Sequence, residues 1–124
     1  MLARFEAGCR QEADGAYREL YADADMTLFV WYKDRAHLRR VVAFQILWPD
    51  DKMIAWNDDG KLSYCEVSHD DDSGLSGARS SVAIRDLGPI PAEVIEEFQD
   101  KALRIDRATA DFVVNTVRSH NIGT

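Results

Sequence analysis

The strongest concentration of chemically reactive side chains lies between Asp50 and Asp72. This stretch holds eight acidic residues and only two lysines, and therefore most of the formal net charge of −7. The acidic residues are Asp50, Asp51, Asp58, Asp59, Glu66, Asp70, Asp71 and Asp72. Grouped carboxylates can bind a hard cation through their oxygens, or can attract a positively charged partner. A focused negative patch restricts the choice of partners in a way that diffuse acidity does not.

The expected strands and turns divide these acidic residues between the two ends of a sheet. Two short runs with alternating apolar residues, 52–56 and 61–67, flank the sequence Asn-Asp-Asp-Gly at 57–60, which is a strong hairpin signal. Alternate connections of an antiparallel meander lie at the same end. We therefore expect the turn at 49–51 to approach the loop after residue 67, about 20 Å from the hairpin turn. The predicted binding site at that end consists of Asp50, Asp51, His69, Asp70, Asp71 and Asp72.

Three uses of this acidic cluster are open on the sequence alone. The simplest is a solvated loop whose aspartates form turns and prevent aggregation at a sheet edge. The second is a docking site for a basic protein or peptide, and the third is a cation site. The nearest match to a calcium-binding loop runs from Ala55 to Glu66. It lacks a carboxylate at its first position and lies between strands instead of helices, so we predict no metal centre there.

Aromatic residues on successive expected strands indicate an alternative function. Trp31, Trp48, Trp56 and Tyr64 could line a pocket in a small-molecule-binding or enzymatic domain. The competing interpretation is that these rings form the core and the cross-strand pairs of the sheet. A closed core without a cavity beside these side chains would exclude the pocket.

Several classes of function and location are disfavoured. The chain contains no phosphate-binding loop, dinucleotide-binding glycine motif, nucleophile elbow or zinc-protease motif, so we expect no cofactor and lean against an enzyme. Its basic clusters are too small to offset the negative field, so we expect no nucleic-acid partner. No signal peptide is evident, and the longest apolar run, 41–48, is too short to cross a membrane. With Cys9 and Cys65 interpreted as free thiols, we expect a cytoplasmic protein.

The elements that must position these residues are predicted from hydrophobic periodicity. Apolar residues spaced three and four apart predict a helix over residues 2–22. At 38–48 a strand is favoured over a helix. Further strands are expected at 26–33, 52–56, 61–67 and 79–87. Pro91 starts a helical region that is either one kinked helix or two helices, with Asp106 as the candidate N-cap of the second segment.

Together these elements predict a single α+β domain over residues 1–124. They favour one antiparallel meander of four or five strands, covered on one face by the N-terminal helix and by one or two C-terminal helices. In size, acidity and layout the chain is similar to two kinds of small bacterial protein: type III secretion chaperones, and immunity proteins that neutralise basic toxins. The sequence therefore favours a non-catalytic binding module for a basic partner. The edge strand at 79–87 could also pair with a second copy in a homodimer.

Overall fold

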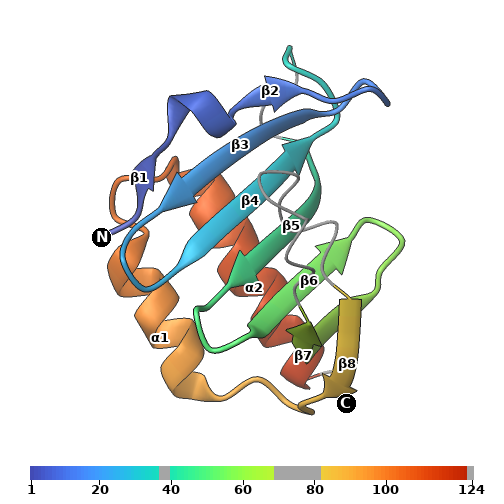
Figure 1. Cartoon of the computed structure of the whole chain (residues 1–124), viewed down its shortest axis with the longest axis vertical. Coiled ribbons are helices and arrows are strands. Elements are labelled where there is room, and N and C mark those ends of the chain that lie inside the picture. Colours follow the sequence, from blue (N-terminus) through green and yellow to red (C-terminus); the bar gives the residue numbers. More distant parts are fainter. Residues whose placement is uncertain (37–39, 69–81, 123–124) are drawn as a thin grey trace.

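The described residues form one antiparallel sheet with two α-helices packed against one of its faces (Figure 1). The computed structural model describes residues 1–36, 40–68 and 82–122. The strands are β1 (Ala3–Arg4), β2 (Arg10–Gln11), β3 (Tyr17–Ala22), β4 (Thr27–Tyr32), β5 (Val41–Leu47), β6 (Lys52–Asn57), β7 (Leu62–Ser68) and β8 (Val82–Asp86). The helices are the short 3-10 helix η1 (Glu6–Gly8), α1 (Ala92–Lys101) and α2 (Arg107–Ile122).

The order of the strands is that of a meander with an extra pair of short strands at its start. Within the described chain the sheet has eight strands in the order β1-β3-β4-β5-β6-β7-β8, and β2 pairs with β3 on the same side as β1. Every pair of neighbouring strands is antiparallel. Because consecutive strands reverse direction, the β3–β4 and β5–β6 turns lie at one end of the sheet, and the β6–β7 turn lies at the other.

The predicted N-terminal helix over residues 2–22 is wrong, and the sheet has more strands than the four or five expected. This segment instead forms η1 and the strands β1 to β3. In β3, Tyr17 and Tyr21 lie on the face that the helices cover, while Leu20 packs on the opposite face. Because apolar residues occur on both faces of β3, the alternation typical of a strand is lost. The remaining spacing of three and four residues imitates a helix.

Two glycines show why this segment turns instead of continuing as a helix. Gly15 has a φ of +94°, in the left-handed region, and lies in the tight turn between β2 and β3. Gly8 lies directly against the side chain of Leu20, where a β-carbon would clash. The chain can therefore fold back onto β3, with which both β1 and β2 pair.

The central strands confirm the predictions made for them. The segment 38–48, where strand competed with helix, contains β5, which pairs with both β4 and β6. The hairpin turn at 57–60 is also confirmed: the N–H of Gly60 donates to the carbonyl of Asn57 at 3.1 Å, and Gly60 has a φ of +92°. β8 forms one edge of the sheet. Pairing of this edge with a second copy stays a prediction.

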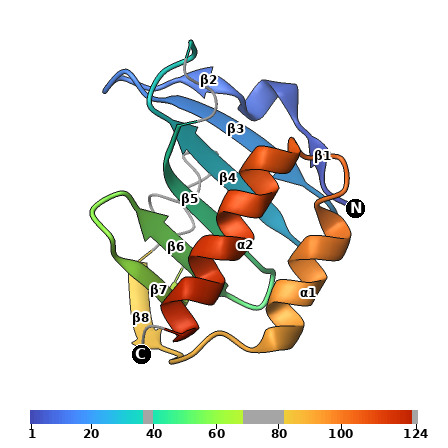
Figure 2. The same cartoon turned by 180° about the vertical axis from the view of Figure 1, so that it is seen from behind.

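Two separate helices follow the sheet. α1 begins directly after Pro91, whose missing N–H costs nothing at the start of a helix. The carboxylate of Asp106 accepts a hydrogen bond from the backbone N–H of Thr109 at 3.2 Å, as expected of an N-cap for α2. Both helices lie across the same face of the sheet (Figure 2). The prediction of C-terminal helices on one face is therefore confirmed, in its two-helix form.

The main core lies between these helices and the sheet. Its most buried side chains, each at most 2% exposed, include Val30, Phe44, Ile54, Phe98 and Val113. The opposite face of the sheet carries a second buried apolar group that consists of Phe29, Trp31, Ala16 and Ala43. β4 is therefore buried on both faces, as a central strand should be.

Replacement of Gly15 with alanine distinguishes the observed turn from the predicted helix. At a φ of +94° alanine is strained, so we expect the free energy of unfolding to fall by about 1–2 kcal/mol. In a helix the same change would instead raise it by about 1 kcal/mol. Urea denaturation of both proteins measures the sign, and a stabilised variant would contradict the turn.

Candidate functional site: the acidic end of the sheet

One end of the molecule gathers carboxylates from three segments that are far apart in the sequence. Two of these segments are the β3–β4 turn and the β5–β6 turn, which lie at the same end of the sheet. The third is α1, which runs along this end in both views (Figures 1 and 2). We call this surface the acidic end. It consists of Asp23, Asp25, Asp50, Asp51, Glu93, Glu96, Glu97 and Asp100.

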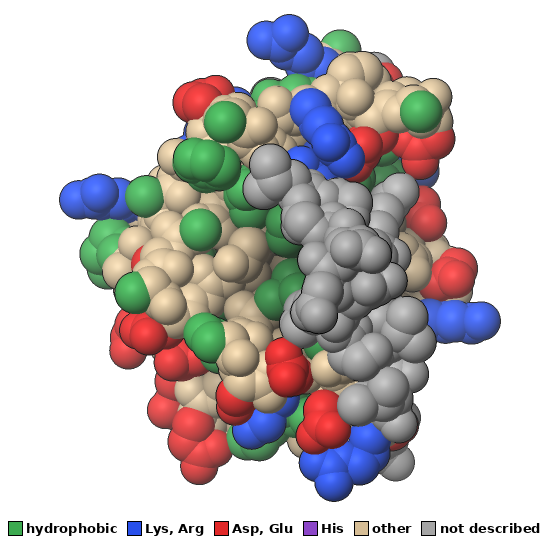
Figure 3. Space-filling model, viewed as in Figure 1, with side chains coloured by type: hydrophobic (Ala, Val, Ile, Leu, Met, Phe, Trp, Pro, Cys, Tyr) green, Lys and Arg blue, Asp and Glu red, His purple; other side chains and the backbone are tan. Residues whose placement is uncertain are grey.

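The carboxylates of α1 form a stripe along one side of the helix. Glu93, Glu96, Glu97 and Asp100 follow the spacing i, i+3, i+4 and i+7, which covers about 10 Å of helix length. Three of them are exposed, and Glu97 is half-buried and accepts a hydrogen bond from the indole N–H of Trp48 at 2.9 Å. Figure 3 shows acidic side chains gathered at the lower left of the molecule, where α1 lies in Figure 1.

Asp23 connects the β3–β4 turn to the end of α1. One carboxylate oxygen accepts a hydrogen bond from Lys101 Nζ at 2.7 Å and lies 3.3 Å from the N-terminal ammonium group. The other oxygen accepts hydrogen bonds from the backbone N–H groups of Asp25 and Met26, both at 2.8 Å. The hydrogen bond from Lys101 holds the pKa of Asp23 well below its usual range, although burial acts in the opposite direction. Asp23 is therefore an ionised carboxylate that is already fully engaged within the fold.

The β5–β6 turn is partly explained by its own backbone. Asp51 has a φ of +66°, a left-handed conformation in which aspartate is enriched among residues other than glycine. Its carbonyl accepts a hydrogen bond from the N–H of Val67 at 2.7 Å, so the end of β7 lies beside this turn. Asp50 lies 3.3 Å from Lys52, and an exposed pair of this kind contributes little to stability.

The structure describes two of the six predicted binding residues. Asp50 and Asp51 are exposed at the acidic end, and Asp58 and Asp59 lie in the β6–β7 turn at the opposite end of the sheet. The remaining four lie outside the described residues, and their part in the site stays a prediction. These four are His69, Asp70, Asp71 and Asp72.

The four aromatic residues predicted to line a pocket are divided between different surroundings. Trp31 is 1% exposed and lies on the face away from the helices, where its indole N–H donates to Glu12 at 3.0 Å. Trp48, Trp56 and Tyr64 pack on the side of the helices. Of these, Trp56 lines an open groove beside α2.

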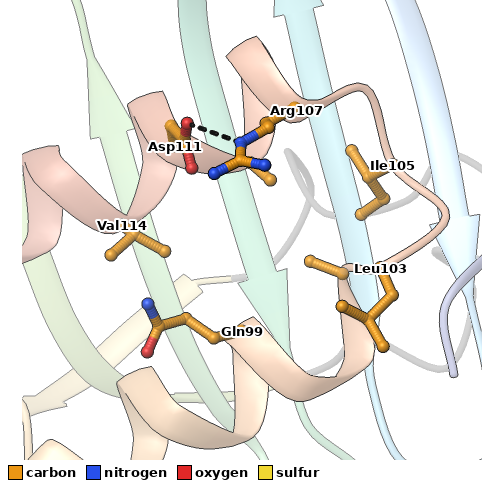
Figure 4. A pocket seen from close by; sticks show the side chains of 8 residues that line it. Gln99, Leu103, Ile105, Arg107, Asp111 and Val114 are labelled. Atoms are coloured by element: carbon orange, nitrogen blue, oxygen red, sulfur yellow. Dashed lines mark ion pairs between the residues drawn. The ribbon is translucent and has the colours of Figure 1, made fainter.

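A hollow of about 330 Å³ lies between the two helices (Figure 4). Arg107 and Asp111 lie on its rim, 3.7 Å apart and both well exposed. Leu103, which is 74% exposed, lies on the other side. A single exposed leucine beside a solvated ion pair is ordinary surface, so we assign no function to this hollow.

Sequence reasoning missed a buried carboxylate in the middle of β3. Glu19 is 5% exposed, lies 2.8 Å from Arg4 Nη1 and accepts a hydrogen bond from the hydroxyl of Tyr21 at 2.9 Å. Burial is the main cause that raises the pKa of Tyr21, and the hydrogen bond to Glu19 adds to it. The hydroxyl of Tyr32 lies 2.8 Å from Thr109 Oγ1 at the start of α2. These contacts tie β1 and α2 to the sheet, so we interpret them as structural.

The carboxylates of the acidic end are spread out and do not converge on one point. Among residues 1–36, 40–68 and 82–122, no group of three or more His, Cys, Asp or Glu side chains is placed to hold a metal ion. In the same part of the chain, no helix is long and apolar enough to cross a membrane.

Comparisons with protein-family models, with curated proteins and with solved structures find no match for this chain. Its function therefore has to be inferred from its own geometry and charge.

Acid unfolding tests whether Asp23 holds α1 to the sheet. Because its pKa is lowered by folding, its stabilising effect is complete above the ordinary carboxyl pKa of about 4 and is lost as the pH falls through the lower folded value. We expect Asp23→Asn to be less stable than the wild type at neutral pH, with a difference that shrinks from about pH 5 downward. Unfolding by urea, followed from neutral to strongly acidic pH, measures this difference.

Asp25→Asn is the matched control, because its carboxylate is 73% exposed in the same turn. Its stability should follow that of the wild type over the whole pH range. A deficit in Asp23→Asn that does not change with pH would contradict the role of the Asp23 charge.

Proposed function

We propose that this protein is a non-catalytic binding module that docks a positively charged protein or peptide against the acidic end. The observation that carries the proposal is the carboxylate stripe of α1, which lies beside the aspartates of two turns of the sheet. A surface of one charge sign on rigid elements accelerates the approach of a partner of opposite sign and restricts its orientation.

Like-charge pairs within the stripe destabilise its own helix, although the helix dipole favours Glu93 in the first turn. Glu93 and Glu97, like Glu96 and Asp100, are like-charged residues at i and i+4, and each such pair destabilises a helix by roughly 0.2–0.5 kcal/mol. Asp100 also lies in the last turn of α1, where the helix dipole disfavours a negative charge. A bound cation would convert this repulsion into attraction. The stripe is therefore better explained by a charged partner than by solubility alone.

Nearby cations leave the exposed part of the stripe available. Lys101 is engaged by the aspartates of the β3–β4 turn at 2.7 and 3.6 Å, and Lys52 pairs with Asp50. In the part of the chain that the structure describes, no cation forms an ion pair with the exposed carboxylates Glu93, Glu96 and Asp100.

Removal of charge from the stripe should stabilise the protein and weaken binding at the same time. In the double variant Glu96→Gln/Asp100→Asn, we expect the free energy of unfolding to rise by about 0.5–1 kcal/mol, because like-charge repulsion is relieved. Its affinity for a decaarginine peptide should fall by about five-fold, since two of the attracting charges are gone. Calorimetric titration at about 50 mM salt measures this affinity, and wild-type binding should weaken steeply towards about 500 mM salt.

The matched control is Asp58→Asn/Asp59→Asn, which removes the same charge from the hairpin turn at the opposite end of the sheet. Its affinity for the peptide should change by less than about two-fold. Equal losses in the two double variants would mean that only net charge matters, and would overturn the proposed site. The same pair of variants, used as bait in a cell extract at low and high salt, then separates partners of this site from non-specific cations.

A further inference from the structure

An open groove of about 500 Å³ lies between α2 and the β6–β7 hairpin. This hairpin is on the side of α2 that faces away from α1 (Figure 2). Its floor consists of Trp56 and Leu62 from the β6–β7 hairpin and Phe112 from α2. Trp56 stacks on the ring of Phe44 with centroids 5.6 Å apart, and the ring of Phe112 meets Trp56 edge-on at 5.1 Å. The three floor side chains are partly exposed, so the groove presents an ordered apolar surface to solvent.

One side of α2 forms the wall of the groove. Its residues recur at steps of three and four, which places them on a single face of the helix. They are Phe112, Asn115, Thr116, Ser119 and His120. Beyond Phe112 this face of α2 carries no apolar residues that could pack against the hairpin. It also carries none of the Asp, Glu, Lys or Arg residues that are typical of a helix face turned to solvent. It carries polar side chains that can form hydrogen bonds.

The described lining of the groove therefore offers hydrogen bonds and little charge. Among the described residues that line it, none is Asp, Glu, Lys or Arg, although these residue types make up 30% of the chain, and His120 is its titratable side chain. The indole N–H groups of Trp31 and Trp48 each donate to a glutamate, whereas within the described chain the indole N–H of Trp56 has no acceptor. An apolar floor with a few polar groups around it is the usual composition of a small-molecule site, and such sites span about 300–1,000 Å³.

We propose that this groove binds a small, uncharged, planar ring compound that carries a hydrogen-bond acceptor. The ring packs against Trp56, Leu62 and Phe112, and its acceptor accepts a hydrogen bond from the indole N–H of Trp56. Further polar groups on the ligand meet Asn115 and Ser119. An ionised ligand would lose hydration here without gaining a counter-charge, which is unfavourable. This site shares no residue with the acidic end, so it stands independently of the function proposed above.

Three naphthalene derivatives of equal size test the chemical class of the ligand. 2-Naphthamide, 2-naphthoate and 2-naphthamidine share one ring system and are neutral, negative and positive. We expect the amide to shift the NMR signals of the Trp56 indole N–H and of the backbone amides at 115–120, with an affinity about ten-fold higher than that of either ion. An amidine that binds more tightly than the amide would overturn the proposal, because the net charge of −7 would then explain the binding.

Blocking variants test the location. Ser119→Phe fills the groove and should abolish the shifts caused by the amide, and Asn115→Leu, also on the exposed surface, should weaken binding by removing a polar contact. The matched control is Leu103→Phe, which adds a ring to the hollow between the helices and should leave binding unchanged. The wild-type pattern of amide signals in each free variant verifies folding. Unchanged binding in both groove variants, or no shift in the wild type at millimolar amide, would refute the site.

Discussion

The carboxylate of Asp23 anchors the C-terminal end of α1 at the acidic end. This carboxylate forms ion pairs with Lys101 at the end of α1 and with the N-terminal ammonium group. It also accepts hydrogen bonds from two backbone N–H groups of its own turn. It therefore joins three segments that are distant in the sequence. A backbone hydrogen bond from Leu2 N–H to the carbonyl of Lys101, at 2.9 Å, reinforces the same junction. The side chains of Asp23 and Lys101 are only 9% and 17% exposed, and several hydrogen bonds fix their geometry. Such a pair is held more firmly than an isolated ion pair in solvent.

This junction divides the carboxylates into two groups. The carboxylates of the β3–β4 turn form ion pairs with Lys101, the one lysine of α1. The stripe on the outer side of the helix has no ion pair with a cation among the described residues. Because the stripe is mounted on a packed helix, a partner would not have to order it on binding, which lowers the entropic cost of association. The groove on the far side of α2 has a different chemistry: an apolar floor and a polar wall, with no Asp, Glu, Lys or Arg among its described lining residues. One helical layer therefore separates two surfaces suited to different kinds of ligand.

The strands from β4 to β7 could be predicted because short alternating runs end at recognisable turn residues, such as those at 57–60. β3 could not be predicted in this way, because Arg18 and Glu19 are charged residues that are only 5% exposed. Arg18 donates a hydrogen bond to the carbonyl of Gly8 and lies over the ring of Phe29. Glu19 forms an ion pair with Arg4 of β1. The burial of both charges therefore depends on partners that only the fold supplies. The aspartates of the β5–β6 turn could be placed by the alternation of a meander. The position of the α1 carboxylates beside these turns could not be predicted, because it involves a contact between Asp23 and Lys101, which are 78 residues apart.

The central claim is that a cationic partner binds where α1 meets the two acidic turns. The most direct test is an NMR titration of the isotopically labelled wild-type protein with decaarginine, followed through its backbone amide signals. We predict the largest shifts at 93–101, 50–51 and 23–25, with the hairpin turn at 57–61 little changed. Largest shifts at 57–61, or shifts spread evenly over all exposed carboxylates, would contradict this account.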